Sequence, residues 1–135
     1  MKRMRVVVAD DVALMLSMVT ELLRRSCEVV GTASNGRTAL EKTLELEPDV
    51  VVLDVSMPLM NGIEVARKLR KLGSKAKIVF LTSYEDSAIQ ESCLFAGGLG
   101  YVLKDFISTD LVPAMNQALA GRVFISSHSS SHELC

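Results

Sequence analysis

The sequence predicts an α/β domain built on a five-stranded parallel sheet with helices on both of its faces. Short apolar runs, rich in valine, alternate five times with longer segments whose apolar residues recur every three or four positions. The runs do not alternate with polar residues, so they are typical of strands that are buried on both faces. Because such strands alternate regularly with helices, they favour a doubly wound three-layer arrangement.

The first two strands and helices follow from local signals. Residues 5–9 are an apolar run that ends at an acidic pair, and residues 12–25 have the spacing of an amphipathic helix. A second strand is expected over residues 28–33, followed by the turn signal Asn35-Gly36. The next helix has to end before Pro48, because a residue that precedes proline disfavours the helical conformation.

The third strand is the element around which the rest of the chain is arranged. Residues 50–53 are Val-Val-Val-Leu, and they lead directly into Asp54. The residues from 57 to 62 have loop character, and the next helix is expected to run from about residue 63 to Gly73. Asp54 therefore emerges from the carboxyl end of a buried strand, which is where open α/β sheets bind their ligands.

The last two repeats deliver a hydroxyl and an ammonium group to the same edge of the sheet. A strand over residues 77–81 leads into Thr82, and a strand over residues 99–103 leads into Lys104. A helix over about residues 86–96 separates these strands, and a final helix stops at Gly121. Because proline has no backbone N–H to donate, we expect that helix to begin late, so that Pro113 stays in its first turn with Thr109 or Asp110 as N-cap.

Composition excludes several classes of protein. The 135 residues fit one domain, predicted over residues 1–122, with residues 123–135 as a tail or truncated linker that includes the Ser/His-rich stretch with His128 and His132. The net charge of −1 indicates no nucleic-acid contact within this chain, and no apolar run is long enough for a membrane span. Three widely spaced cysteines favour a reducing cytoplasm over a disulfide framework.

The strand ends together form a chemical constellation. Asp10 and Asp11 follow the first strand, and Asp54 follows the third, so three carboxylates are expected to converge. A hard divalent cation such as Mg²⁺ would relieve their repulsion. With Thr82 and Lys104 opposite, the set is suited to a phosphoryl group, with Asp54 supplying the attacking oxygen.

The same residues allow other interpretations. An acidic pair before a helix is often only an N-cap, and a single Thr or Lys after a strand is usually structural. A phosphatase with an aspartyl nucleophile shares the sheet and Mg²⁺, but it needs an Asp-x-Asp pattern that the first strand lacks. An interaction module that is never phosphorylated is a third hypothesis, and no Gly-x-x-x-x-Gly-Lys motif supports nucleotide binding.

The chain resembles the receiver (CheY-like) domain of bacterial two-component response regulators over residues 4–121. The matching motifs are Asp10-Asp11 after a hydrophobic strand, Leu53-Asp54-Val55-Ser56-Met57-Pro58 with Gly62 following, Leu81-Thr82-Ser83 and Tyr101-Val102-Leu103-Lys104. The sequences around residues 29–36 and 100–105 look like receivers of the NarL/FixJ type. The resemblance implies a flavodoxin-like fold with strand order 2-1-3-4-5.

The resemblance also implies a role for each site residue. Asp54 would accept the phosphoryl group from a sensor histidine kinase or a phosphotransfer protein. Mg²⁺ would bind Asp11, Asp54 and the backbone carbonyl of Ser56, assisted by Asp10. Thr82 and Lys104 would contact the phosphate, and Thr82 and Tyr101 would form the switch.

As a whole, such a protein would be a cytoplasmic phosphoacceptor switch, not an enzyme, that supports its own phosphotransfer and autodephosphorylation. Phosphorylation could lead to a homodimer, and the output would be transcription regulation if a DNA-binding domain followed. Leu99 departs from the small or polar residue usual in its turn, and we expect it to add an apolar group to the face formed by the fourth helix and fifth strand.

Overall fold

A single parallel sheet with strand order β2-β1-β3-β4-β5-β6 organises the molecule. The computed structural model describes residues 3–126. The strands are β1 (Met4–Ala9), β2 (Cys27–Ala33), β3 (Val50–Asp54), β4 (Lys77–Thr82), β5 (Gly100–Leu103) and β6 (Phe124–Ile125). The predicted five-stranded flavodoxin-like sheet is confirmed, and the short β6 extends it at the β5 edge.

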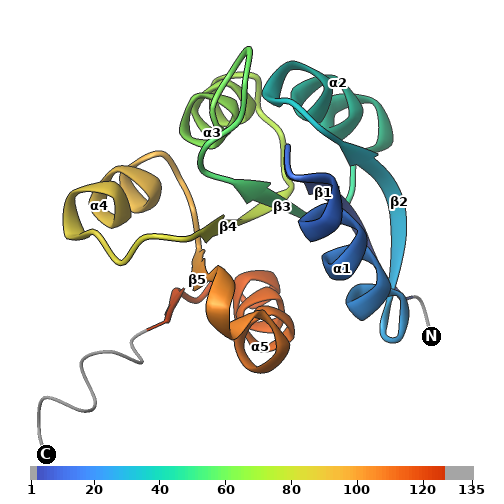
Figure 1. The fold of residues 1–135 in the computed structure, drawn as a ribbon. Helices are drawn as coiled ribbons and strands as arrows, with labels where there is room; N and C mark the ends of the chain where they lie inside the picture. Colours follow the sequence, from blue (N-terminus) through green and yellow to red (C-terminus); the bar gives the residue numbers. More distant parts are fainter. Residues whose placement is uncertain (1–2, 127–135) are drawn as a thin grey trace, which may run out of the picture.

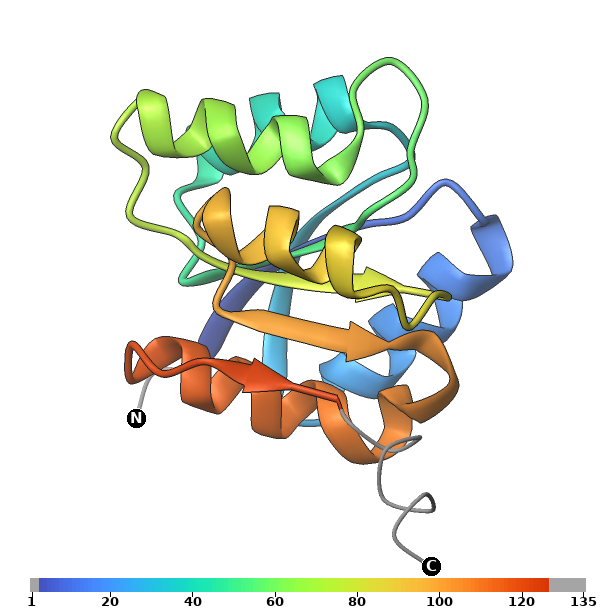
Figure 2. The same ribbon diagram turned by 90° about the vertical axis from the view of Figure 1, so that its left-hand side faces the viewer.

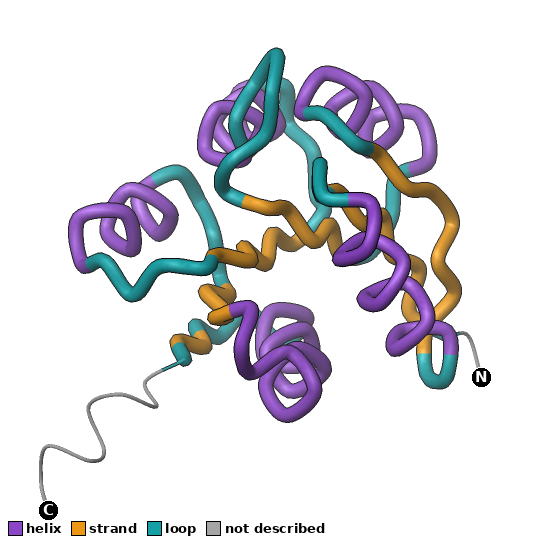
Figure 3. The backbone as a smooth tube through the Cα atoms, in the orientation of Figure 1, coloured by secondary structure: helices purple, strands orange, loops and turns teal. Residues whose placement is uncertain are grey.

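Helices cover both faces of the sheet (Figures 1 and 3). They are α1 (Ala13–Arg24), α2 (Gly36–Leu46), α3 (Gly62–Lys71), α4 (Ser87–Phe95) and α5 (Ile107–Leu119), and a single 3₁₀ turn, η1 (Lys104–Phe106), joins β5 to α5. Residues of α2, α3 and α4 pack against one face, and residues of α1 and α5 pack against the other. The doubly wound, three-layer arrangement is therefore as predicted.

Strand register brings the ends of the central strands to the same level. Ala9 of β1 pairs with Leu53 of β3, so the residues that follow them, Asp10 and Asp54, leave the sheet side by side. Asp54 pairs in turn with Leu81 of β4, one residue before Thr82. The apolar residues of β1 and β3 point alternately into the two helical layers, which explains why these strands show no polar alternation.

The beginning of α5 differs from the prediction. The helix begins at Ile107, with Phe106 as N-cap, so Pro113 lies inside the helix and not in its first turn. The hydroxyl of Thr109 donates to the carbonyl of Phe106, and the carboxylate of Asp110 accepts from Ser126. Because both side chains are engaged elsewhere, neither caps the helix, and the expected late start was wrong.

Leu99 also lies differently from our expectation. It packs against the cluster formed with α1 and α5, and not on the face of α4. Its carbonyl accepts the amide of Phe124 at 2.8 Å, which begins the pairing of β6 with β5.

The remaining predictions concern the cysteines, membrane-spanning helices and the C-terminal residues. Cys27 and Cys93 are buried free thiols, as expected of a chain without a disulfide framework. Among residues 3–126, no helix is both long and apolar enough to cross a bilayer. The boundary at residue 122 stays a prediction, and Cys135 and the stretch with His128 and His132 lie outside the described residues.

Candidate functional site

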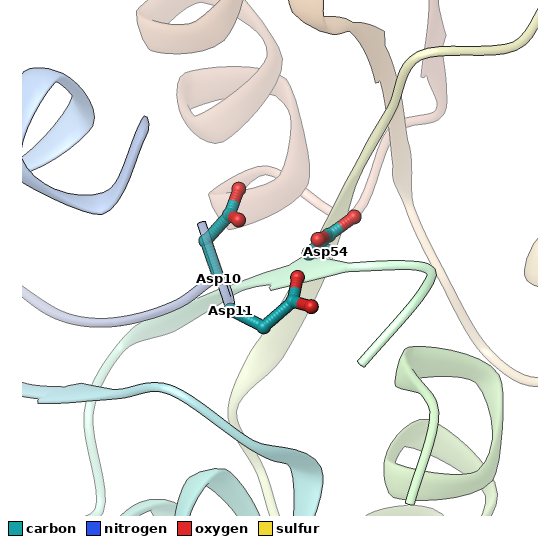
Figure 4. A group of neighbouring side chains, drawn as sticks. All are labelled: Asp10, Asp11 and Asp54. Carbon is teal, nitrogen blue, oxygen red and sulfur yellow. The ribbon is translucent and has the colours of Figure 1, made fainter. Parts of the chain in front are cut away.

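Three carboxylates meet at the carboxyl ends of β1 and β3. Ligand oxygens of Asp10, Asp11 and Asp54 lie within 4.8 Å of one another, and Figure 4 shows the three side chains around a common space. Asp10 is completely buried and Asp54 is nearly so, whereas Asp11 faces solvent. The carboxylate of Asp10 is fixed by the backbone amide of Val12, at 2.9 Å. Asp10 thus fixes the turn before α1 and contributes to the cluster as well, whereas the N-cap of α1 is Val12, without a side-chain cap.

Lys104 closes the site from the end of β5. Its ammonium nitrogen lies 3.0 Å from Asp10 Oδ2 and 3.3 Å from Asp54 Oδ2, and its side chain is only 10% exposed. Asp10 Oδ2 has no well-aligned hydrogen-bond partner among the described residues, so its contact with Lys104 is mainly an ion pair. One cation therefore faces three acids, and the cluster carries an excess of negative charge.

That excess changes the acidity of Asp54. Burial, followed by the negative charge of Asp10, raises the pKa of Asp54 from 3.8 to about 7. The ammonium of Lys104 and the backbone amide of Ser56, 3.3 Å from Asp54 Oδ1, act in the opposite direction. For Lys104, burial lowers the pKa, but the close contact with Asp10 and the charge of Asp54 outweigh it and raise the pKa overall.

Thr82 ends β4, one residue beyond the partner of Asp54, and Tyr101 lies within β5. Thr82 is buried, and its hydroxyl oxygen accepts the amide of Tyr84 at 3.1 Å. Tyr101 is completely buried, and its hydroxyl donates to the carbonyl of Tyr84 at 2.9 Å. Both side chains therefore bind the backbone of the loop between β4 and α4, so a movement of either would be felt by that loop.

The loop between β3 and α3 forms a close wall of the site. Gly62 lies so near β3 that a Cβ atom there would be 2.3 Å from the carbonyl oxygen of Asp54. The amide of Gly36 donates to the carbonyl of Pro58 at 3.2 Å, which ties this loop to the start of α2. Glycine is required at residue 62 because any side chain would push the loop away from Asp54.

The donor set fits a hard divalent cation. Oxygen ligands from carboxylates are those that Mg²⁺ prefers, and a cation between them would remove the repulsion that raises the pKa of Asp54. Asp10, Asp11 and Asp54 are the residues that could hold it. The part expected for the Ser56 carbonyl stays a prediction, since the contact seen for Ser56 is that of its amide.

Most of the predicted site residues come together. Lys104 contacts Asp10 and Asp54, Asp11 lies within 4.8 Å of these acids, and strand register brings Thr82 next to Asp54. Sequence reasoning missed the ion pair between Lys104 and Asp10, and it missed the Tyr84 carbonyl as the anchor of the Tyr101 hydroxyl. No local signal marks either contact, because each joins residues from different strand ends.

Comparison with known proteins identifies related chains. A family model described as the response regulator receiver domain matches residues 6–116. The chemotaxis protein CheY of Thermotoga maritima is 36% identical over 114 residues, which are 84% of this chain and 95% of that protein. The nitrate/nitrite response regulator protein NarL of Escherichia coli K12 is 35% identical over 125 residues, or 90% of this chain. This chain spans 57% of the length of that NarL protein.

Solved structures give the same result. The signal receiver domain of a response regulator called NarL from Mycobacterium tuberculosis superposes with a TM-score of 0.86 at 35% identity, covering 90% of this chain and 100% of that one. A two-component response regulator of the LuxR family from Aurantimonas sp. SI85-9A1 gives a TM-score of 0.89 at 30% identity, covering 96% and 94%.

Proposed function

This chain belongs to the response regulator receiver domain family, and on that basis we propose that Asp54 is its phosphoacceptor. A receiver domain is not a conventional enzyme, since its own side chain is the group that is modified. The observation that carries the proposal is the position of Asp54, which faces Lys104 at 3.3 Å and two further acids within 4.8 Å. Asp10 is also buried, contacts Lys104 at 3.0 Å and belongs to the potential metal site, so it is the resemblance to receiver domains that assigns the acceptor role to Asp54.

The phosphotransfer follows from this geometry. A carboxylate oxygen of Asp54 forms the new P–O bond while the P–N bond of a donor phosphohistidine breaks, and the imidazole nitrogen keeps the electron pair of that bond. Lys104 and the hydroxyl of Thr82 would balance negative charge on the phosphoryl oxygens. Bound Mg²⁺, held by Asp10, Asp11, Asp54 and the Ser56 carbonyl, would supply further positive charge beside those oxygens.

Ionisation of Asp54 is part of the reaction. With a pKa of about 7, close to half of the Asp54 side chains would be protonated at neutral pH in the absence of metal, and a protonated carboxyl group is a poor nucleophile. Lys104 keeps the anionic form accessible through its ion pair. We expect Thr82 and Tyr101 to respond to the phosphate together, because both bind the backbone at Tyr84.

Partners and output belong to the same proposal. Receiver domains in two-component systems pair with histidine kinases or phosphotransfer proteins, and we propose such a donor for this chain, with a homodimer as the phosphorylated form. Transcription regulation is the proposed output, supported by relatives such as NarL that extend well beyond the matched region. The buried thiols of Cys27 and Cys93 are compatible with a cytoplasmic location.

Acetyl phosphate tests the proposal directly. The protein is incubated with acetyl phosphate and Mg²⁺, and its intact mass is measured over time. We expect one phosphoryl addition in the wild type, none with EDTA and none in Asp54→Ala. Asp105→Asn, which removes an exposed acid outside the cluster, is the matched control and should be phosphorylated like the wild type.

The same samples report on the fate of the phosphate. After acetyl phosphate is removed, the added mass should disappear spontaneously, which would be the proposed autodephosphorylation. Equal phosphoryl addition to wild type and Asp54→Ala would refute Asp54 as the acceptor. Addition that is independent of Mg²⁺ would refute the metal site.

A further inference from the structure

The segment that follows α5 returns to the sheet and pairs with its edge. In Figure 2 the red strand β6 lies alongside the orange arrow of β5 and next to α5. Phe124 pairs with Gly100, and Ile125 pairs with Tyr101. The backbone bonds are short, at 2.8 Å from Phe124 N to Leu99 O and 2.9 Å from Ser126 N to Tyr101 O.

A buried hydroxyl fixes the end of this segment. Ser126 is only 4% exposed, and its Oγ donates to the carboxylate of Asp110 at 2.7 Å. The same Oγ accepts the backbone amide of Leu103 at 3.2 Å. Asp110 is itself 7% exposed, and its other carboxylate oxygen lies 3.1 Å from the hydroxyl oxygen of Thr109. Buried, charge-assisted hydrogen bonds of this kind are stronger than those on a surface, so residues 124–126 are held firmly.

These contacts touch the phosphorylation machinery at two backbone positions. Leu103, whose amide binds Ser126, directly precedes Lys104, which contacts Asp10 and Asp54. The carbonyl that accepts the Ser126 amide belongs to Tyr101, the proposed switch residue. The segment is thus joined to β5 at Tyr101, which we expect to respond to the phosphate, and at Leu103, which directly precedes Lys104.

We propose that residues 124–126 form a latch on the edge of β5 that loosens when Asp54 is phosphorylated. The latch would carry the signal from the site to the chain beyond residue 126, and this inference rests on the proposed function of Asp54. A phosphoryl group adds negative charge and bulk next to Lys104, so the ammonium has to turn from Asp10 toward the phosphate oxygens.

A small movement of this kind is enough to weaken the latch. Lys104 is the first residue of η1 and follows Leu103 directly, so a displacement of the Lys104 backbone would be passed through Leu103 to its amide. The bond from that amide to Ser126 is 3.2 Å long and already near the end of the usual range. Coupling is reciprocal: a change that weakens the latch has to favour the phosphorylated conformation.

Hydrogen exchange with a phosphoryl mimic tests the latch. The full chain is measured by mass spectrometry with Mg²⁺, with and without beryllofluoride, and peptides that cover residues 122–126 and 101–104 are followed. In the wild type we expect faster exchange at residues 124–126 when the mimic is bound. Ser126→Ala should exchange fast at these residues in both states.

Affinity provides the reciprocal measurement. Because a buried hydrogen bond contributes about 1 kcal/mol, Ser126→Ala should bind beryllofluoride about fivefold more tightly than the wild type. Asp110→Asn, which keeps the shape of the side chain but weakens the acceptor, should shift affinity in the same direction by a smaller factor. Thr43→Ala is the matched control, since it also removes a buried hydroxyl, in α2 and remote from the latch.

The outcomes separate the latch from the proposed function. If the intact-mass experiment shows no phosphorylation of Asp54, the proposed function fails and the latch proposal fails with it. If Asp54 is phosphorylated but exchange at residues 124–126 is unchanged or slower with the mimic, the latch alone is wrong. Equal beryllofluoride affinity in Ser126→Ala and Thr43→Ala would likewise overturn the coupling.

Discussion

Two adjacent parts of β3 are buried to almost the same degree but differ in what burial does to them. Val50 to Leu53 are completely buried, and Asp54 is 4% exposed. Burial of the apolar side chains stabilises the fold, whereas burial of Asp54 beside Asp10 raises its pKa to about 7 and opposes its ionisation. Burial of residues 50–53 therefore stabilises the folded protein, whereas burial of ionised Asp54, where the proposed chemistry takes place, destabilises it.

The largest effect is expected at the last apolar residue of the strand. Leu53→Ala should lower the free energy of unfolding by about 3 kcal/mol, because it removes buried methyl groups and leaves a cavity between the strands and α3. Urea denaturation followed by circular dichroism measures this change. Leu72→Ala is the control: Leu72 is 58% exposed, so its truncation should cost less than about 0.5 kcal/mol. An equal decrease in the free energy of unfolding in Leu53→Ala and Leu72→Ala would show that burial of Leu53 adds no stability.

The ammonium group of Lys104 compensates for the buried negative charge of Asp10 and Asp54. Lys104→Met removes the only cation described within reach of Asp10 and Asp54, leaving two buried acids without an ion-pair partner. We expect a loss of about 2 kcal/mol at pH 8, less than for a wholly buried pair because Asp54 can take up a proton instead. Lys75→Met, at an exposed lysine, is the control and should be near neutral. A near-neutral Lys104→Met would mean that the ion pairs add nothing to stability.

The apolar part of this comparison could be predicted from the sequence, and so could the identity of the acids. Five apolar runs fix where the buried strands lie, and parallel strands have to deliver the residues that follow them to one edge. For this reason the sequence alone predicts that Asp10, Asp54 and Lys104 lie together. The roles of the site residues rest on the family resemblance and not on the strand pattern.

Long-range contacts account for what the sequence did not predict. Asp110 has the local signature of an N-cap, but its carboxylate binds Ser126, which is 16 residues away. β6 has two residues, too few for any periodicity to reveal, and it forms because β5 offers an open edge. The predicted start of α5 was wrong for the same reason, since the carboxylate of Asp110 binds Ser126 and the helix begins at Ile107.

Removing the charge of Asp54 should stabilise the metal-free protein. The folded carboxyl group has a pKa of about 7 against an ordinary value of 3.8, so the folded state binds its proton more tightly than the unfolded chain does. The stabilisation from that proton is complete below about pH 4 and is lost as the pH rises through 7. Asp54→Asn should therefore be more stable than the wild type by about 1 to 2 kcal/mol at pH 8, and equal to it at pH 4.

Urea denaturation in EDTA at several pH values measures this difference. Asp105→Asn serves as the control, because it removes an exposed acid and should change stability little at any pH. Mg²⁺ should then stabilise the wild type at pH 8 and leave Asp54→Asn almost unaffected, since binding to the folded state alone adds stability. An Asp54→Asn variant that is less stable than the wild type at pH 8 would show that Lys104 already compensates for the buried charge.

Tyr101 has a buried apolar ring and a buried polar hydroxyl in one side chain. We expect the smallest change in the free energy of unfolding when that hydroxyl is removed. Its ring is completely buried among apolar residues, and its hydroxyl reaches the loop beyond Thr82, where it donates to the carbonyl of Tyr84. Tyr101→Phe keeps the ring and should cost only about 1 kcal/mol, because the freed carbonyl can bind water. It should, however, speed hydrogen exchange at residues 84–86, which the hydroxyl holds. Tyr84→Phe removes the hydroxyl of a side chain that is 64% exposed and should change neither quantity, so matching results for the two variants would mean that burial of the ring, and not its polar tip, holds the loop in place.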